Sequence, residues 1–381
     1  MKLLCALTYY RPYTSGLTIY VERLATALAR RGHSVTVLTS QYDPSLPQSE
    51  TIDGVRVVRA PVVARVSKGV IMPTFGGIAT ALALQHDAMS LHLPQFDAPG
   101  LALRGRLRRQ PVVLTYHSDL QLPPGMFNRV ANNVVDLANL AAGSLATRIV
   151  AYTQDFADHS PFLRRFREKI VVIPPPVEVA ATTPAEVTGF REQWNLRGPV
   201  IGMAARLAAE KGVEVLLKAL PKVLAYHPEA RVLFAGPHEN VLGEAAYARR
   251  LAPEFARFAG HWTFLGTLGP HEMAAFFPNL DVLVVPSLNS TETFGLVQVE
   301  AMLSGTPSIA SALPGVRQPV HQTGMGEVVP IGDSDALAAA ILRVIELRAR
   351  YQRPRETIAA TFSTERTVIE YERLFGELQA L

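Results

Sequence analysis

Two glutamates eight positions apart, Glu292 and Glu300, carry the pattern with the clearest chemical meaning in this sequence. Residues 282–285, before them, are an unbroken apolar run, which predicts a buried parallel strand that ends in a polar turn. After the turn, residues 293–305 predict a helix that stops at a glycine. Glu292 then lies at the start of this helix and Glu300 about two turns inside it, so both carboxylates could accept hydrogen bonds from hydroxyl groups.

The first turn of the predicted helix offers backbone donors between these two carboxylates. Amides there have no partner within the helix and lie at the positive end of its dipole, so they suit a phosphate or sugar oxygen. One turn could therefore read both ends of a sugar nucleotide, with Glu292 accepting from the sugar and Glu300 from a ribose. The amides concerned belong to Thr293, Phe294, Gly295 and Leu296.

A basic pair follows the strand predicted at residues 200–203. Arg206 can grip a phosphate through two N–H groups, and Lys211 supplies a compact point charge. A nucleoside diphosphate that departs as a glycosidic bond breaks needs two cations, or one divalent metal, to take up its charge. The alternative is that Lys211 only starts the next helix.

These two segments closely resemble the signature motifs of the retaining glycosyltransferases of family 4. Glu292-Thr-Phe-Gly-Leu-Val-Gln-Val-Glu300-Ala-Met is similar to the Glu-x7-Glu motif, and Arg206-Leu-Ala-Ala-Glu-Lys211-Gly to the Arg-Leu-x-x-x-Lys-Gly loop. One departure is Ala205, where the family often has glycine. The resemblance covers nearly the whole chain and implies an α/β chain of the GT-B fold. That fold has two Rossmann-like domains facing each other across a cleft, and a C-terminal helix that crosses back to the first domain.

The resemblance implies transfer of a sugar from a GDP-, UDP- or ADP-linked donor to a hydroxyl acceptor, with retained configuration and without a metal or cofactor. Arg206 and Lys211 hold the diphosphate in this interpretation, Glu292 orients the sugar, and Glu300 holds the ribose. No carboxylate is placed as a covalent nucleophile. The resemblance implies that the acceptor attacks on the face that the leaving phosphate vacates, and that this phosphate assists deprotonation of the acceptor.

Further segments match the family less completely. The turn around Ser15-Gly16 is similar to a glycine-containing loop that faces the donor, because a glycine lets the backbone approach a ligand closely. Gly266, in Phe-Leu-Gly-Thr, lies in a segment that resembles the one contacting the nucleobase. His117 follows an apolar strand, and matching histidines contact the transferred sugar; the alternative is a structural histidine. Asp119 contacts an acceptor or only caps the following turn. His92 ends another predicted strand, which points in the same direction as the strand before His117.

Alternating apolar runs and helical patterns must position these residues, and they predict parallel sheets built from βαβ units. The proline-rich segment 173–185 is the predicted linker. We expect a first domain at residues 1–177, a donor-binding domain at 186–355, and a returning helix at 356–381 whose apolar members include Ile369. Strands are predicted at residues 2–7, 34–39, 55–59, 89–93, 112–116, 148–151, 200–203, 231–235, 262–265, 281–285 and 308–310; helices at 18–31, 78–84, 130–145, 213–225, 245–258 and 335–350.

Composition narrows the class of protein. Residues 1–185 carry 19 Lys and Arg against 12 Asp and Glu, whereas residues 186–381 carry 18 against 21. The basic first half favours an anionic partner such as a membrane surface or a lipid phosphate; the alternative is solvated helix ends. No aromatic interleaving or motif suggests nucleic acid. The densest basic clusters are Arg104, Arg106, Arg108 and Arg109, and Arg164, Arg165, Arg167 and Lys169.

Other features set the compartment. No apolar run reaches the roughly 18–20 residues of a membrane-spanning helix. The single cysteine, Cys5, excludes an internal disulfide framework and favours a reducing cytoplasm. The basic first half adds the expectation of peripheral contact with the inner face of a membrane. Asp333-Ser-Asp335 is similar to the metal motif of another glycosyltransferase class, but helix capping explains it.

Two alternative functions remain at this level. A GT-B-fold phosphorylase or sugar-nucleotide epimerase has similar donor contacts, and would show phosphate-dependent sugar-1-phosphate formation or conversion of donor without acceptor. A non-catalytic, membrane-associated scaffold would use the basic first half. Binding of a nucleoside diphosphate that is lost in Lys211→Ala would argue against this scaffold.

Overall fold

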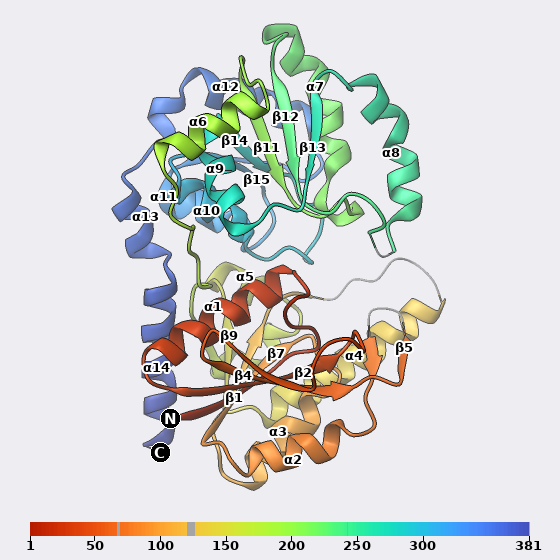
Figure 1. Ribbon diagram of the computed structural model, residues 1–381, viewed down its shortest axis with the longest axis vertical. Coiled ribbons are helices and arrows are strands. Elements are labelled where there is room, and N and C mark those ends of the chain that lie inside the picture. Colours follow the sequence, from red (N-terminus) through yellow and green to blue (C-terminus); the bar gives the residue numbers. More distant parts are fainter. Residues whose placement is uncertain (67–68, 120–125, 242, 381) are drawn as a thin grey trace. The chain divides into compact units, whose positions relative to one another are not determined.

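The computed structural model describes residues 1–66, 69–119, 126–241 and 243–380, and of residues 66 and 126–131 the backbone only. The chain forms two compact units, Met1–Pro176 with Phe362–Leu381, and Val177–Thr361. Each is a Rossmann-like unit with its own sheet and core, as predicted (Figure 1). Among the described residues, no helix is both long and apolar enough to cross a membrane.

The first unit contains an eight-stranded sheet of order β10-β9-β8-β7-β1-β2-β4-β3, parallel except for the edge strand β3. Its strands are β1 (Lys2–Ala6), β2 (Ser34–Gln41), β3 (Ser49–Ile52), β4 (Val55–Pro61), β7 (Ala88–Leu93), β8 (Val112–Tyr116), β9 (Arg148–Ala151) and β10 (Ile170–Val172), with a hairpin of β5 (Ala64–Val66) and β6 (Gly69–Ile71). Its helices are α1 (Gly16–Arg30), α2 (Phe75–Ala83), α3 (Ala98–Leu107), α4 (Met126–Leu145), α5 (Gln154–His159), the 3₁₀ helix η1 (Leu163–Lys169) and α14 (Thr364–Gln379).

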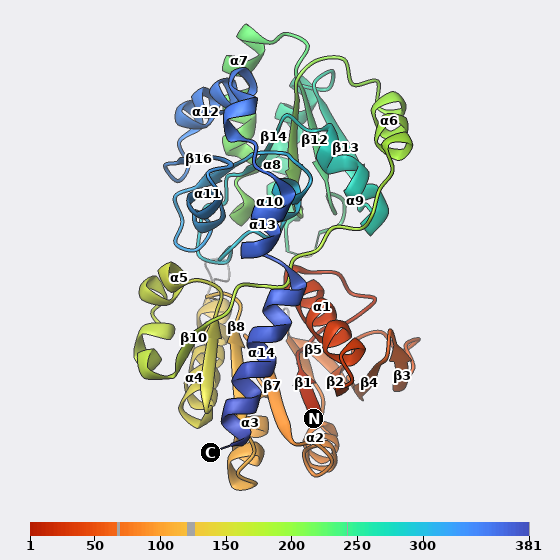
Figure 2. The same ribbon diagram turned by 90° about the vertical axis from the view of Figure 1, so that its left-hand side faces the viewer.

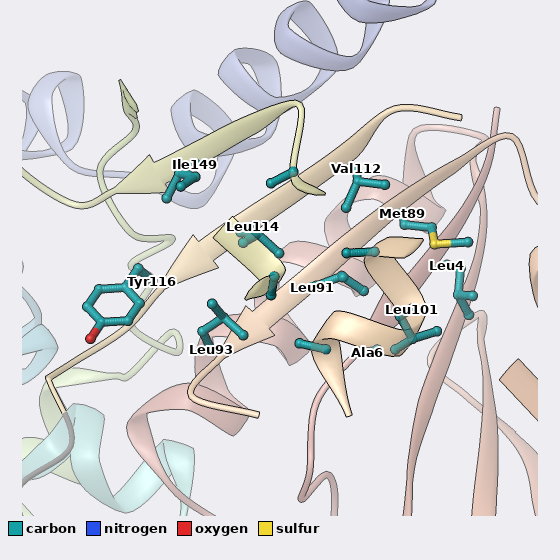
Figure 3. Packing of buried hydrophobic residues seen from close by; sticks show 14 of the residues in the cluster. Leu4, Ala6, Met89, Leu91, Leu93, Leu101, Val112, Leu114, Tyr116 and Ile149 are labelled. Carbon is teal, nitrogen blue, oxygen red and sulfur yellow. The ribbon is translucent and has the colours of Figure 1, made fainter. Parts of the chain in front are cut away.

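Side chains on one face of this sheet form an apolar core with α2, α3 and α4. Successive strand residues point to opposite faces, so every second residue of β7 and β8 joins this core. Figure 3 shows Leu101 of α3 beside these strand residues. The strand residues concerned are Met89, Leu91 and Leu93 of β7 and Val112, Leu114 and Tyr116 of β8.

The other face of the sheet is covered by α1 and by α14, which packs on α1 and runs beside the first unit (Figure 2). The hydroxyl of Tyr371 in α14 lies 2.8 Å from that of Tyr20 in α1 and 2.7 Å from that of Thr115 in β8. The predicted apolar face of this helix needs one correction. Ile369 is 47% exposed, and Tyr371 is buried in its place, because the polar Tyr371 hydroxyl finds partners inside the unit.

Replacing Tyr371 with Phe should lower the free energy of unfolding by about 1–3 kcal/mol, because two buried hydroxyl groups lose their shared partner. Chemical denaturation measures this change. The matched control is Tyr226→Phe at a tyrosine that is 74% exposed. Equal stability of Tyr371→Phe and the control would mean that this hydrogen-bonded triad does not hold α14.

The second unit contains a six-stranded parallel sheet of order β13-β12-β11-β14-β15-β16. Its strands are β11 (Val200–Ala204), β12 (Arg231–Ala235), β13 (Trp262–Gly266), β14 (Val282–Val285), β15 (Ser308–Ser311) and β16 (Gly326–Val329). Its helices are α6 (Pro184–Gln193), α7 (Val213–Tyr226), α8 (Ala245–Arg257), α9 (Pro270–Phe276), α10 (Leu296–Leu303), α11 (Gln318–Thr323), α12 (Ser334–Glu346) and α13 (Arg355–Thr361), with 3₁₀ helices η2 (Ala209–Lys211), η3 (Phe277–Asn279) and η4 (Arg348–Tyr351).

Local signals explain how α12 begins and ends. The Asp333 carboxylate accepts from the amides of Asp335 and Ala336, at 3.0 and 2.9 Å, so the predicted helix cap is confirmed. The predicted end near Arg350 is wrong, since α12 stops at Glu346 and η4 follows. The helical residue pattern continues through both elements, and therefore does not reveal the change of helix type.

Candidate functional site

The strand order of the second sheet marks one position for a ligand. Strands β11 and β14 are neighbours; the chain leaves β11 toward β12 on one side and β14 toward β15 on the other. Open α/β sheets bind ligands outside the carboxyl ends of the strands at such a reversal. The loop after β11 carries Arg206 and Lys211, and the loop after β14 carries Glu292.

The structure brings these two loops together through charged side chains. Lys211 Nζ lies 2.5 Å from an Oε atom of Glu292, and each of these side chains is 19% exposed. Arg206 donates to the carboxylate of Glu210 at 2.7 Å, one position before Lys211. Both predicted cations are therefore held by carboxylates at the β11–β14 edge, and Lys211 and Glu292 are direct partners.

Gly212 allows the backbone of the two loops to meet. Its φ is +69°, and a Cβ atom there would lie 2.0 Å from the carbonyl oxygen of Pro286. The amide of Leu288 also donates to the carbonyl of Glu210 at 2.9 Å. No residue larger than glycine fits this position without moving one of the loops.

The predicted start of α10 requires a correction. The helix begins at Leu296, so Thr293, Phe294 and Gly295 lie in the preceding turn. Gly295 has a φ of +73°, a left-handed conformation that a right-handed α-helix cannot contain. The helix can therefore begin only after this residue. Its amide donates to the second carboxylate oxygen of Glu292 at 3.1 Å.

Glu300 is consequently little more than one turn inside α10, and not two turns as predicted. It is 9% exposed, while Thr293 and Phe294, in the turn, are 4% and 1% exposed. The helix is short because its first predicted turn is replaced by the loop that Glu292 caps. The carboxylates of Glu292 and Glu300 are thus separated by this loop and one helical turn. The backbone of a single segment fixes their spacing.

The carboxyl ends of β12 and β13 lie farther along the same edge. Gly266 ends β13 with a φ of +75°, and nothing lies within 4 Å of an added Cβ. The ring of His238, in the loop after β12, stacks on Phe264 with centroids 4.3 Å apart. Sequence reasoning missed His238, since only the pairing of β12 with β13 places it beside Phe264.

In the first unit the strand order reverses between β1 and β7. Gly16 is the first residue of α1, which follows β1, and Ser15 caps this helix by accepting from the Thr18 amide at 3.2 Å. Nothing lies within 4 Å of a Cβ built on Gly16. The structure therefore places Gly16 at the expected edge, without a steric demand for glycine from the neighbouring residues.

His117 follows β8 and is held inside the first unit by both ring nitrogens. Nε2 lies 2.9 Å from Nδ1 of His92, and Nδ1 bonds the hydroxyl of Tyr152. Tyr20 stacks on Tyr152 with centroids 5.3 Å apart and meets His117 edge-on at 4.9 Å. His92, Tyr152 and Tyr20 were not predicted as partners of His117; the alternation of buried residues along β7 and β8 is the signal that could have suggested His92.

Burial keeps both histidines neutral. It lowers the pKa of His92 to about 3, and it lowers the pKa of His117 well below its ordinary value, with His92 adding to the effect. Two neutral imidazoles that share a hydrogen bond must act as one donor and one acceptor, so their tautomers are coupled.

The free energy of unfolding should therefore fall as the pH decreases below 6.5. The unfolded chain takes up protons that the folded chain refuses at His92, at His117 and at His86, whose pKa burial also lowers. Each histidine costs up to about 1.4 kcal/mol per pH unit. This loss continues toward the folded pKa near 3. Denaturant unfolding between pH 7.5 and pH 5 measures the slope, which His92→Gln should lower by roughly a third or more. The exposed His271 supplies the control, His271→Gln. An unchanged slope in His92→Gln would show that His92 is not the group responsible.

Asp119 accepts hydrogen bonds from Tyr116 and Ser160, at 3.0 and 2.7 Å. Burial raises the pKa of its carboxyl, while these two hydroxyl groups act in the opposite direction. The alternative role as a cap of the following turn concerns residues 120–125, which lie outside the described residues. Within the described part of the chain, no group of three or more His, Cys, Asp or Glu could hold a metal ion.

The fold and this edge define a class: a chain of two Rossmann-like units whose second sheet has cationic and acidic side chains where its strand order reverses. Comparison with known proteins gives the family. Residues 186–360 match the model "Glycosyl transferases group 1", and residues 15–176 match "Glycosyl transferase 4-like domain". The chain therefore belongs to the family 4 glycosyltransferases, as predicted, and is a glycosyltransferase.

Relatives with known names span most of the chain. A phosphatidyl-myo-inositol mannosyltransferase from Mycolicibacterium smegmatis is 27% identical over 88% of this chain and 83% of its own length. A D-inositol 3-phosphate glycosyltransferase from Stackebrandtia nassauensis is 28% identical over 95% of this chain and 86% of its own.

Solved structures share the fold at lower identity. Sucrose-phosphate synthase from Thermosynechococcus elongatus has a TM-score of 0.77 at 23% identity, covering 100% of this chain and 99% of that one. Anabaena HepE in complex with UDP-glucose has a TM-score of 0.78 at 19% identity, covering 99% of this chain and 100% of that one.

Proposed function

We propose that the protein transfers a sugar from a nucleotide-diphosphate donor to a hydroxyl group of a phosphorylated cyclitol, with retained configuration and without a metal. The observation that carries this proposal is the Lys211–Glu292 ion pair at the β11–β14 edge, with Arg206 in the same loop as Lys211. The pair combines a phosphate-binding cation with a carboxylate that can bind hydroxyl groups.

Charge exchange at this edge gives the donor its place. In the structure Lys211 is neutralised by Glu292, and Arg206 by Glu210. A bound diphosphate competes for both cations, because phosphate oxygens make strong charge-assisted hydrogen bonds. When Lys211 turns to the phosphate, Glu292 is released and accepts hydrogen bonds from the sugar hydroxyls. Glu300 then accepts hydrogen bonds from the ribose, and the segment around Gly266 contacts the base.

Stabilisation of the departing diphosphate is then the main catalytic contribution. Arg206, Lys211 and the amides of the turn before α10 take up its developing charge. The diphosphate itself accepts the acceptor proton on the face it leaves, which retains the anomeric configuration without a protein nucleophile. In the first unit we assign Gly16 to the close approach of the backbone and Asp119 to the acceptor. Both ring nitrogens of His117 are engaged by His92 and Tyr152, so this histidine positions its neighbours and does not bind a sugar hydroxyl itself.

The names of the relatives motivate the choice of acceptor. One acts as a phosphatidyl-myo-inositol mannosyltransferase and another as a D-inositol 3-phosphate glycosyltransferase, so both names contain a phosphorylated inositol. We therefore assign a phosphorylated cyclitol, free or lipid-linked, and a role in glycolipid synthesis. The protein works in the cytoplasm, in peripheral contact with an anionic membrane. The family match does not favour a phosphorylase, an epimerase or a silent scaffold.

A transfer assay tests this proposal. Purified protein is incubated with UDP-, GDP- or ADP-linked sugars and with inositol 3-phosphate or phosphatidylinositol, in chelator and in added magnesium. We expect one donor to give a glycosylated inositol whose anomeric coupling matches that of the donor, at equal rates in both buffers. Transfer to neither acceptor would contradict the assigned acceptor. A product with inverted configuration would contradict retention, and dependence on magnesium would contradict a reaction without a metal.

A further inference from the structure

The two basic clusters of the first unit differ in what their members do. Arg104 donates to carbonyls of Gly76 and Gly100, at 3.0 and 2.9 Å, and to the Thr80 hydroxyl at 2.8 Å. Lys169 donates to three carbonyls at the end of α4, all within 3.0 Å. These two cations therefore hold helices in place and are not available to a ligand.

Three arginines at the end of α3 remain available. Arg106, Arg108 and Arg109 are exposed, and none of them pairs with a carboxylate in the described part of the chain. Residues 98–118 contain no Asp or Glu. The pKa of Lys169 is lowered, first by burial and then by Arg106 and Arg148, so positive charge from three segments gathers around this end of the helix.

Two leucines accompany these charges. Leu103 and Leu107, one helical turn apart, are 46% and 76% exposed. They cannot turn inward, because α3 already packs its opposite face on the sheet: a Cβ on Gly105 would lie 2.3 Å from the Val112 side chain. We call Leu103, Arg106, Leu107, Arg108 and Arg109 the α3 tip.

We propose that the α3 tip docks on an anionic membrane surface. Leucines beside arginines suit the lipid interface, where the apolar chains enter the acyl boundary and the cations meet phosphate groups. The proposal deepens the membrane contact suggested above by naming its surface, and it does not depend on the transfer reaction.

The position of the tip separates docking from chemistry. Helix α3 connects the carboxyl end of β7 to the amino end of β8. With ten residues it is about 15 Å long. The tip therefore lies at the edge of the first sheet opposite to Gly16 and His117, so that substitutions in it leave the candidate site unaltered.

Vesicle sedimentation with the full chain tests the proposal. The wild-type protein should bind phosphatidylcholine vesicles that contain phosphatidylglycerol, bind more weakly in high salt, and not bind pure phosphatidylcholine. Removing one arginine should weaken binding roughly fivefold, so the triple variant Arg106→Gln/Arg108→Gln/Arg109→Gln should lose on the order of 100-fold. Leu103→Ser/Leu107→Ser should lose about tenfold through its smaller apolar contact.

The control variant Arg249→Gln/Leu347→Ser changes an exposed arginine and leucine of the second unit and should bind vesicles like the wild type. All variants should keep their transfer rate on water-soluble inositol 3-phosphate. Absence of wild-type binding, equal binding by the tip variants, or equal binding to neutral vesicles would overturn the docking proposal. Vesicle binding without any transfer activity would instead refute the proposed function and leave docking intact.

Discussion

Glu292→Ala should lower turnover about 10³-fold while lowering the free energy of unfolding by only about 1–2 kcal/mol. The large effect is expected because the sugar loses its main hydrogen-bond acceptor and Lys211 loses the partner that positions it, a loss comparable to removing one transition-state contact. The small effect is expected because one ion pair whose side chains are each 19% exposed and one hydrogen bond in the turn before α10 contribute modestly to stability. Steady-state kinetics and denaturant unfolding on the same preparation measure both quantities.

Glu292→Gln separates the two functions of this carboxylate. The amide oxygen can still accept from the Gly295 amide and from a hydroxyl group, but it cannot neutralise Lys211. Its turnover should therefore lie between those of wild type and Glu292→Ala. If Glu292→Ala lost stability and activity to the same extent in free energy, the residue would be structural and its catalytic assignment wrong.

Gly212→Ala should cost about 3–5 kcal/mol of stability, a large effect for the addition of one methyl group. The added Cβ atom would overlap the carbonyl oxygen of Pro286 at 2.0 Å, and the residue also has a φ of +69°. The loop that carries Arg206 and Lys211 must move away from the loop after β14 to relieve this overlap. The affinity for a nucleotide should therefore fall together with stability.

Gly305→Ala is the matched control for this substitution. Gly305 lies in the same unit with a φ of +82°, but nothing lies within 4 Å of its added Cβ. It should therefore show only the backbone cost of about 1 kcal/mol. Similar losses in both variants, measured by denaturant unfolding, would mean that contact between the two loops does not require glycine.

The regular part of the fold could be predicted from the sequence because its signals are local. Strands β8, β9 and β12 have the predicted bounds, since each is a short apolar run between polar turns. The antiparallel edge strand β3 was missed, because its residues alternate between exposed and half-buried and form no apolar run. The short helices α5 and α11 were missed for the related reason that six residues do not establish a helical period.

The candidate site was predicted in its residues more than in its geometry. Motif spacing identified Lys211 and Glu292 separately, but their contact follows from the pairing of β11 with β14, which are distant in sequence. The start of α10 was misplaced because Gly295 takes a left-handed conformation that spacing does not reveal. The surroundings of His117 were missed since they come from three segments that are distant in sequence, those of Tyr20, His92 and Tyr152.

The most direct measurement is calorimetric titration of the protein with UDP, GDP and ADP, repeated with Lys211→Ala. The control is Lys218→Ala, at an exposed lysine of α7. We predict that the wild type and the control bind at least one of these diphosphates, and that Lys211→Ala binds it about 100-fold more weakly, as expected for a lost charged hydrogen bond. Binding of none of the three by the wild type, or equal affinity in Lys211→Ala, would contradict the account.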